Sequence, residues 1–199
     1  TDMLFVGDHE SSCHPILDVS NVAQSTLEQL ERAKDIVPSS TGSLPVIFTP
    51  HGVASALITP LAMALNGKTV LRGASPLGHR KGEQVFAPEL SIWDDATIEF
   101  QPASAICDDE GIPSQRTSLV ENGIVMKFLY DLQTAGQAGA QSTGNASRSL
   151  GSLPNPSTSA LIIGEGKTGF ADMLADIKEG LVIEQLMGAT QGNILGGDF

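Results

Sequence analysis

The sequence has few cysteines, few aromatic residues and few basic residues, and each shortage excludes a class of protein. Its 199 residues include two cysteines, Cys13 and Cys107, so no disulfide framework holds the chain together. One Trp, one Tyr and seven Phe leave a core that must be mostly aliphatic. At this length, with 41% hydrophobic residues, the chain can bury a substantial core as one large domain or two small ones.

Positive charge is scarce. Eleven Lys and Arg residues stand against 23 Asp and Glu residues, which gives a formal net charge of -12 with neutral histidines. Binding to nucleic acid or to an anionic membrane surface needs clustered basic residues, and the densest basic run here is only the three residues 79–81. The composition therefore predicts neither a nucleic-acid partner nor a membrane partner.

Long apolar runs are also missing. The most apolar window, residues 53–65, is broken by Thr59 and Pro60 and falls short of the ~18 apolar residues that a membrane-spanning helix needs. No secretory signal pattern is visible, and two cysteines suit a reducing compartment. We therefore expect a cytoplasmic protein. Because the chain begins at Thr1 rather than Met, we also expect it to be part of a longer protein.

Helical and strand patterns alternate along the chain without regular βαβ spacing, and the middle is dominated by strands, which predicts an α+β fold with a mixed or antiparallel sheet. Thr49 followed by Pro50 is typical of a helix start, and Pro60 should kink that helix near Ala56 and Leu57. Asn122–Gly123 between β-prone runs favours a type I′ hairpin. The predicted helices are 18–37 (starting from Asp18 or Ser20), 49–66 (stopped by Gly67) and 168–178; the predicted strands are 44–48, 90–93, 98–100, 115–120, 124–130, 161–163 and 181–186; residues 134–159 are predicted as a loop.

Polar and loop-forming residues are densest between Cys107 and Arg148. This stretch reads D-D-E-G-I-P at 108–113, R-T-S-L-V-E-N-G at 116–123, F-L-Y-D at 128–131 and S-T-G-N-A-S-R at 142–148. Loops of such composition carry function more often than fold. The order of these motifs resembles the C-terminal domain of the TldD/PmbA family, also called modulators of DNA gyrase, and the resemblance runs from about Leu44 to Phe199.

The resemblance implies a β-rich, barrel-like domain with a few flanking helices. It also implies that residues 1–43 are the end of an N-terminal domain or a linker helix, and that residues 44–199 form the C-terminal domain, truncated at its C-terminus. Members of this family are peptide-processing metalloproteases, so the resemblance places the chain in a bacterial system of peptide maturation.

One motif suggests a zinc site. Residues 9–14 spell H-E-x-x-x-H, as does the zinc motif of the catalytic half of the family. In those subunits, however, the motif lies on the helix after the strand that corresponds to 44–48, where this chain offers one histidine, His51, and no glutamate. On a regular helix an i, i+5 pair also lies about 140° apart, so His9 and His14 would not share a face. We therefore expect no zinc site at His9, Glu10 and His14.

By resemblance, the chain corresponds to the PmbA half of the family, also called TldE. That half is a non-catalytic subunit that binds no cofactor itself and pairs with a TldD-like subunit that carries zinc and hydrolyses unfolded or flexible peptides. A homodimer of the isolated chain is a further possibility. Two alternatives stay open: a self-sufficient zinc peptidase that uses His9, Glu10 and His14, and an interaction module that modulates DNA gyrase.

The three adjacent acids Asp108, Asp109 and Glu110 form the first candidate site. In a strand only Asp108 and Glu110 would share a face, where they could act as acid and base, hold a cation or contact a partner or substrate. The alternative is a turn, because acids before Gly-Ile-Pro are typical turn residues.

The loop that contains Thr143, Gly144, Asn145 and Arg148 forms the second candidate site. Asn and Gly suit left-handed backbone, and an arginine can bind a carboxylate through two parallel hydrogen bonds. Such a loop can bind a peptide or a partner subunit. The alternative is that Arg148 pairs with one of the chain's own acids and ties the loop down.

Overall fold

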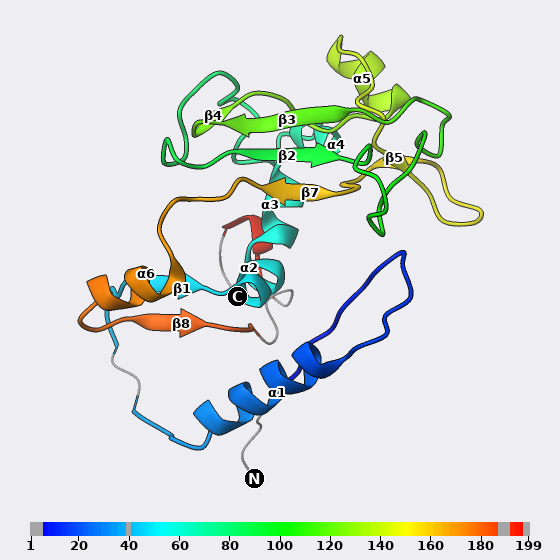
Figure 1. Ribbon diagram of the computed structural model, residues 1–199. Helices are drawn as coiled ribbons and strands as arrows, with labels where there is room; N and C mark the ends of the chain where they lie inside the picture. The colour runs from blue at the N-terminus through cyan, green and yellow to red at the C-terminus, as the bar shows by residue number, and fades with distance from the viewer. Residues whose placement is uncertain (1–5, 39–40, 187–191, 197–199) are drawn as a thin grey trace. The chain divides into compact units, whose positions relative to one another are not determined.

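The structure is a computed structural model that describes residues 6–38, 41–186 and 192–196. The chain divides into two compact units (Figure 1). Unit 1 comprises Thr1–Ser43 with Glu99–Pro102, and unit 2 comprises Leu44–Ile98 with Ala103–Phe199. We describe each unit by itself.

Among its described residues, unit 1 contains one regular element, the helix α1 (Ser20–Arg32). The helix was predicted, but it ends five residues before the expected Val37. Its N-cap is Val19, and the Asp18 carboxylate accepts a hydrogen bond from the Ser20 backbone N–H (2.8 Å). None of its residues is buried, so within unit 1 the apolar stripe of α1 remains exposed.

Unit 2 is built around a four-stranded antiparallel sheet of order β4-β3-β2-β7 (Figure 1). The hairpin of β3 and β4 was predicted, and it turns as expected, with φ values of 49° at Asn122 and 80° at Gly123. Its second strand is much shorter than the predicted 124–130. The four strands are β2 (Ile92–Asp95), β3 (Arg116–Glu121), β4 (Ile124–Val125) and β7 (Leu161–Ile163).

Three short helices precede this sheet in unit 2. The Thr49 hydroxyl accepts from the Gly52 N–H (3.1 Å) at the start of α2 (Pro50–Ala56), as predicted. The predicted break near residue 57 is confirmed, because α3 (Ile58–Ala64) follows as a separate helix and Pro60 lacks the N–H that a continuous helix would need. The predicted end of the helix 49–66 was wrong. Gly67 does not stop a helix but begins α4 (Gly67–Leu71), which Asn66 caps.

The core of unit 2 lies between these helices and the sheet. It is aliphatic, as the composition predicted, apart from one phenylalanine. Because each strand carries apolar residues toward the helices, burial of this cluster is the main favourable term in the folding of unit 2. Its buried members are Ala64, Leu65, Leu77, Ile92, Leu119, Val120, Val125, Phe128 and Leu129.

Two further pairs of strands complete unit 2. The first is parallel and joins β1 (Val46–Phe48) to β8 (Leu181–Ile183), which is three residues shorter than predicted. The second is antiparallel and joins β5 (Ala146–Ser147) to β6 (Asn155–Pro156). The remaining elements are α6 (Phe170–Asp176) and the 3₁₀ turn η1 (Ile194–Gly196).

Several predicted details were wrong. The segment 134–159 is not one loop, because α5 (Leu132–Ala138) occupies its start and β5 and β6 lie within it. Residues 98–100 form no strand. The helix α6 is capped by Gly169 rather than Thr168 and ends two residues before Lys178. The missed helix follows Asp131, whose carboxylate accepts from the Thr134 N–H (2.7 Å) in a capping box.

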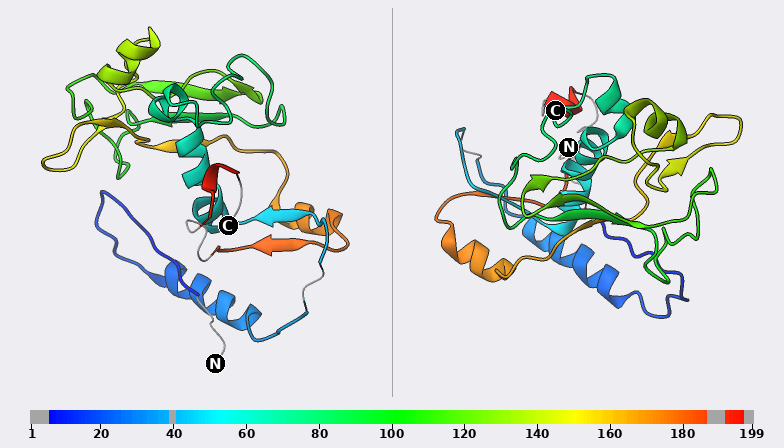
Figure 2. Two further views of the ribbon diagram at one scale, coloured as in Figure 1. Left: turned by 180° about the vertical axis from the view of Figure 1, so that it is seen from behind. Right: turned by 90° about the horizontal axis from the view of Figure 1, so that it is seen from above.

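The α+β class with an antiparallel main sheet is confirmed, but the barrel is not. Across the described residues the strands form three separate sheets of two, four and two strands, and none closes on itself (Figure 2). No helix in the described part of the chain is long and apolar enough to cross a lipid bilayer.

Candidate functional site

The acidic triplet forms a turn, as the alternative interpretation held. The Asp108 carboxylate accepts from the N–H groups of Glu110 (3.0 Å) and Ile112 (2.9 Å). The Gly111 N–H donates to the Asp108 carbonyl (3.0 Å), and Gly111 has a φ of 78°. Three acids are therefore adjacent because they build a tight turn with a left-handed glycine.

The same carboxylates fasten this turn to other segments. Asp108 Oδ2 accepts from the Ala146 N–H (2.9 Å), and Asp109 Oδ2 accepts from the Arg148 N–H (2.8 Å). Glu110 Oε2 accepts from the Leu132 N–H (2.7 Å) at the start of α5. Hydrogen bonds to a charged acceptor are stronger than neutral ones. The three carboxylates are thus directed at three different backbone donors and do not converge on one point.

The first residues of the loop 142–148 are fixed to Tyr130, which lies just before α5. The Thr143 N–H donates to the Tyr130 carbonyl (3.1 Å), and the Thr143 hydroxyl accepts from the Tyr130 N–H (2.9 Å). Gly144 has a φ of 70°, and a Cβ there would lie 2.6 Å from the Pro113 carbonyl oxygen. Glycine is therefore required at 144 both by the backbone angle and by the close approach.

Asn145 connects the loop to the sheet through a buried polar network. Its amide Nδ2 donates to Asp94 Oδ2 (2.6 Å), and the Ser159 N–H donates to Asp94 Oδ1 (2.9 Å). The Ser159 hydroxyl also bonds to Asp94. Asp94 is 1% exposed and Asn145 is 5% exposed. Sequence reasoning missed Asp94, although two aspartates directly after the apolar pair Ile92–Trp93 were a usable signal.

One atom of this network has no partner. Asn145 Oδ1 is the single buried side-chain oxygen or nitrogen among the described residues that makes no hydrogen bond. The amide cannot be reversed to satisfy it, because a reversed amide would place its oxygen against the Asp94 carboxylate. A buried acceptor of this kind is usually satisfied by an internal water.

Arg148 ties the loop through its backbone and not through its side chain. Its N–H bonds Asp109, whereas its guanidinium makes no ion pair with any described residue. The alternative interpretation, in which this side chain pairs with one of the chain's own acids, is therefore wrong for the described part of the chain. Arg116 behaves differently, since its guanidinium lies 4.4 Å from the centroid of the Trp93 ring in a cation–π contact.

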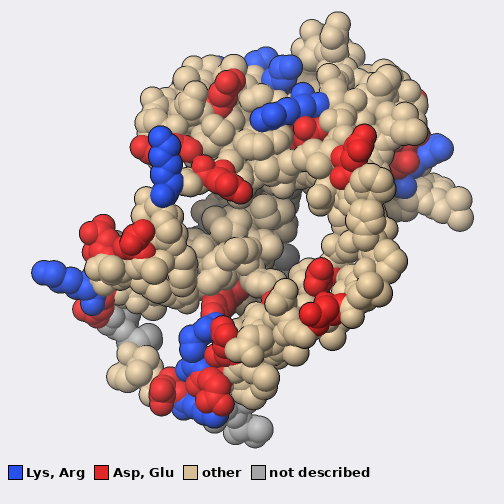
Figure 3. Space-filling view, in the orientation of Figure 1, with Lys and Arg blue, Asp and Glu red and all other residues tan. Residues whose placement is uncertain are grey.

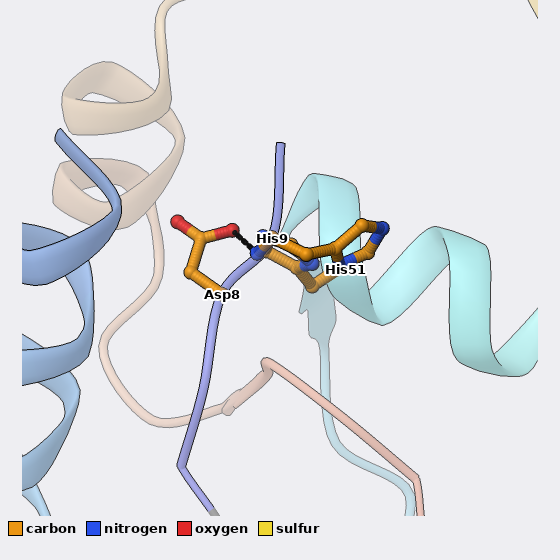
Figure 4. A group of neighbouring side chains, drawn as sticks. All are labelled: Asp8, His9 and His51. Carbon is orange, nitrogen blue, oxygen red and sulfur yellow. Dashed lines mark hydrogen bonds between the residues drawn. The ribbon is translucent and has the colours of Figure 1, made fainter. Parts of the chain in front are cut away.

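The H-E-x-x-x-H segment does not form a helix. Residues 6–19 contain no regular element, and the His14 ring stacks on Phe100 with 4.8 Å between centroids. The His9 N–H donates to Asp8 Oδ1 (2.7 Å), as Figure 4 shows. His51 lies in the other unit, on α2. Within either unit taken alone, no three described His, Cys, Asp or Glu side chains bring their ligand atoms within 4.8 Å of one another.

The Tyr130 side chain, next to the candidate site, is partly buried. Its backbone is hydrogen-bonded to Thr143. A Cβ added at Gly67 would lie 2.3 Å from the Tyr130 ring carbon Cδ1, so the ring packs directly against Gly67. Partial burial raises the pKa of the Tyr130 phenol above its ordinary value of 10.0.

Comparison with known proteins identifies relatives along most of the chain. The family described as PmbA/TldA metallopeptidase C-terminal domain matches residues 41–199. An uncharacterised protein of Methanocaldococcus jannaschii is 33% identical over 201 residues, which cover 99% of this chain and 47% of that protein. A metalloprotease TldD homologue of Haemophilus influenzae is 32% identical over 164 residues, which cover 82% of this chain and 34% of that protein.

The fold also matches a solved structure. The crystal structure of TldE from Thermococcus kodakarensis superimposes with a TM-score of 0.76 at 28% identity, covering 86% of this chain and 39% of that one. The chain spans between about a third and about a half of the length of these relatives. The motifs at 108–113 and 142–148 lie within the matched region.

Proposed function

Because the chain belongs to the TldD/PmbA metallopeptidase family, we propose that it is a non-catalytic, PmbA/TldE-like subunit of a heterodimeric zinc protease. Its partner is a TldD-like subunit that holds zinc and cleaves unfolded or flexible peptides in the cytoplasm. This chain binds no metal itself and completes the assembly. Its acidic surface favours a basic substrate or a complementary patch on the partner.

The observation that carries the proposal is the chemistry of the corner from β1 to α2. By resemblance, the catalytic subunits place their H-E-x-x-x-H motif on the helix after this strand. Here the strand and the helix both form, so the position is well defined. From Pro50 to Ala64, the two helices α2 and α3 offer His51 as their one metal-binding side chain and no carboxylate. A zinc peptidase needs about three protein ligands and a general base.

The two candidate loops then serve assembly and not chemistry. Their carboxylates and amides are used in hydrogen bonds that fix the backbone at Ala146, Arg148 and Leu132. Rigid, pre-ordered loops lower the entropic cost of binding. We therefore assign Asp108, Asp109, Glu110, Thr143, Gly144 and Asn145 a positioning role at the partner or substrate surface, with Arg148 available to contact it.

The described residues of either unit, taken alone, favour neither alternative function. A self-sufficient peptidase would need His9, Glu10 and His14 to converge, and in unit 1 these three do not bring their ligand atoms together. A role on DNA gyrase through direct DNA contact would need a basic surface, which a net charge of -12 does not supply.

Metal analysis with a peptidase assay tests the proposal. The chain and the zinc-bearing relative from the same organism are purified separately and mixed, and zinc content and cleavage of an unfolded peptide are measured for each sample. We expect less than about 0.1 zinc per chain here, no cleavage by this chain, and cleavage by the mixture. The peptidase alternative would replace the proposal if this chain alone bound near-stoichiometric zinc and cleaved the peptide. In that case His9→Ala or His14→Ala should lose both the zinc and the cleavage.

A further inference from the structure

The connection between β5 and β6, which we call the arm (residues 148–154), carries apolar side chains into solvent. It projects from the rest of unit 2 in every view (Figures 1 and 2). Leu150 is 107% exposed and Leu153 is 78% exposed, whereas a core leucine such as Leu65 is 0% exposed. Single exposed leucines are ordinary, but two leucines on one short projecting connection form a local apolar surface.

The arm is ordered by its own hydrogen bonds. The Ser152 N–H donates to the Ser149 carbonyl (3.0 Å), and the Ser149 N–H donates to the Ser152 hydroxyl (2.9 Å). Gly151, between them, has a φ of 80°, which glycine adopts without strain. The two leucines are therefore held outward by a defined turn.

The base of the arm is the candidate site itself. Ala146 pairs with Pro156 in the β5–β6 ladder, and Asp108 and Asp109 accept from the backbone on either side of Ser147. Asn145, the residue directly before β5, donates a hydrogen bond to the buried Asp94. The acidic triplet and the S-T-G-N-A-S-R motif thus form a rigid base from which the arm extends, and such pre-organisation favours binding.

The chemistry of the arm indicates what it fits. Its two leucines need an apolar recess, and Arg148 beside them has a guanidinium that no described carboxylate neutralises. A recess bordered by acidic side chains would satisfy both. Long-range repulsion between two molecules of charge -12 disfavours a second copy of this chain, and the proposed function names the zinc-bearing subunit as the partner.

We propose that the arm is the docking element with which this chain inserts Leu150 and Leu153 into an acid-bordered apolar recess of the zinc-bearing subunit. The inference rests on the proposed function, since it names the surface through which that assembly forms. Two leucines do not make a whole interface, which typically buries about 1,600 Å². The arm is therefore an anchor within a larger contact.

Affinity measurements on the full chain test this inference. Titration calorimetry with the zinc-bearing relative is done for the unmodified chain, for Leu150→Asp and for the double variant Leu150→Asp/Leu153→Asp. Leu17→Asp is the matched control, because Leu17 is 93% exposed and lies in unit 1. Arg148→Glu tests the charge, and circular dichroism verifies that each variant is folded.

We expect Leu150→Asp to weaken binding about tenfold or more and the double variant about 100-fold, with Leu17→Asp unchanged, because burial of a leucine side chain contributes roughly a factor of ten or more to affinity. Arg148→Glu should weaken binding most at low salt.

Undiminished binding by the double variant would refute the docking role of the arm while leaving the proposed function intact. If the two proteins form no complex, the proposed function is refuted, and the zinc-bearing subunit is refuted as the partner of the arm. Self-association that the double variant abolishes would assign the arm to a second copy and overturn the choice of partner.

Discussion

At the scale of single residues, the site depends on one buried carboxylate. Asp94 accepts hydrogen bonds from Asn145 and from both donors of Ser159, and it has no basic side chain as a partner among the described residues. Asp94 thereby joins the loop 142–148 and the segment before β7 to strand β2.

Replacement of Asn145 by Asp should be strongly destabilising. The change puts a second carboxylate in place of the amide nitrogen that lies 2.6 Å from Asp94 Oδ2, so a hydrogen bond becomes a like-charge contact in a buried site. We expect a loss of about 2–4 kcal/mol of unfolding free energy at pH 7, measured by urea denaturation. Asn155→Asp is the control, because Asn155 is exposed and should change stability by less than about 0.5 kcal/mol. Equal losses in the two variants would contradict the role of the network.

Titration of Tyr130 should weaken the fold at alkaline pH. Its folded pKa is raised by burial, so the unfolded chain loses the phenolic proton first. The contribution of this group is fully present below the unfolded pKa of about 10 and is lost as pH rises through the folded pKa. Ultraviolet titration of the tyrosinate band reports this directly, because the sequence contains one tyrosine. A midpoint at or below that of the urea-unfolded chain would contradict the prediction, and Tyr130→Phe supplies the baseline.

At the scale of elements, local signals explain which parts were predictable. The hairpin at Asn122–Gly123 and the start of α2 at Thr49–Pro50 were correctly predicted because each depends on neighbouring residues alone. The helix α5 was missed because its sequence L-Q-T-A-G-Q-A lies in a Gly-rich stretch without an apolar stripe. Its start is fixed by the Asp131 cap and by Glu110, which comes from a segment about 20 residues away.

Loss of the cap should destabilise α5. Asp131→Ala removes the acceptor for the Thr134 N–H and hydroxyl at the start of the helix. We expect a loss of about 1–2 kcal/mol of unfolding free energy, measured by urea denaturation, as is typical of capping residues. Asp172→Ala is the matched control, because Asp172 is exposed in the first turn of α6 and is not its N-cap. A smaller effect at 131 than at 172 would show that the cap is unimportant.

The loop before the arm should tolerate no side chain at position 144. Gly144→Ala combines a left-handed backbone angle with a Cβ that would lie 2.6 Å from the Pro113 carbonyl. Gly139→Ala has a similar φ of 62° but open space around its Cβ, so it isolates the cost of the angle. We expect about 1 kcal/mol of destabilisation at 139 and at least 1 kcal/mol more at 144 in thermal unfolding. Equal shifts of melting temperature would refute the close approach.

At the scale of the whole molecule, the chain combines a high negative charge with exposed apolar strands. The sequence carries a net charge of -12, and Figure 3 shows acidic side chains spread over the visible surface with basic ones between them. The parallel pair β1–β8 is entirely apolar, yet Val46, Leu181 and Val182 are more than 40% exposed. Parallel strands with this composition are normally covered on both faces.

Salt should stabilise the isolated chain. Self-repulsion among 23 acidic residues, opposed by 11 basic ones, is screened when the Debye length falls from about 30 Å at 0.01 M to about 3 Å at 1 M salt. We expect the melting temperature to rise by several degrees between 0.01 and 0.5 M sodium chloride in differential scanning fluorimetry. Choline chloride serves as the control for specific sodium binding and should act similarly. A fall in melting temperature with both salts would contradict the prediction.

The sequence alone determined the α+β class and the aliphatic core, because composition, periodicity and turn residues are local properties. The order of the motifs between Cys107 and Arg148 indicated the family by resemblance. It did not determine what the motifs do. The tertiary structure decided that the turn of the acidic triplet holds the loop 142–148, that Asp94 holds Asn145, and that the loop ends in a projecting arm. The first two facts depend on hydrogen bonds between segments 38 to 65 residues apart. Spacing along a chain does not reveal which distant groups meet, because that is set by packing of the sheet and helices around one core.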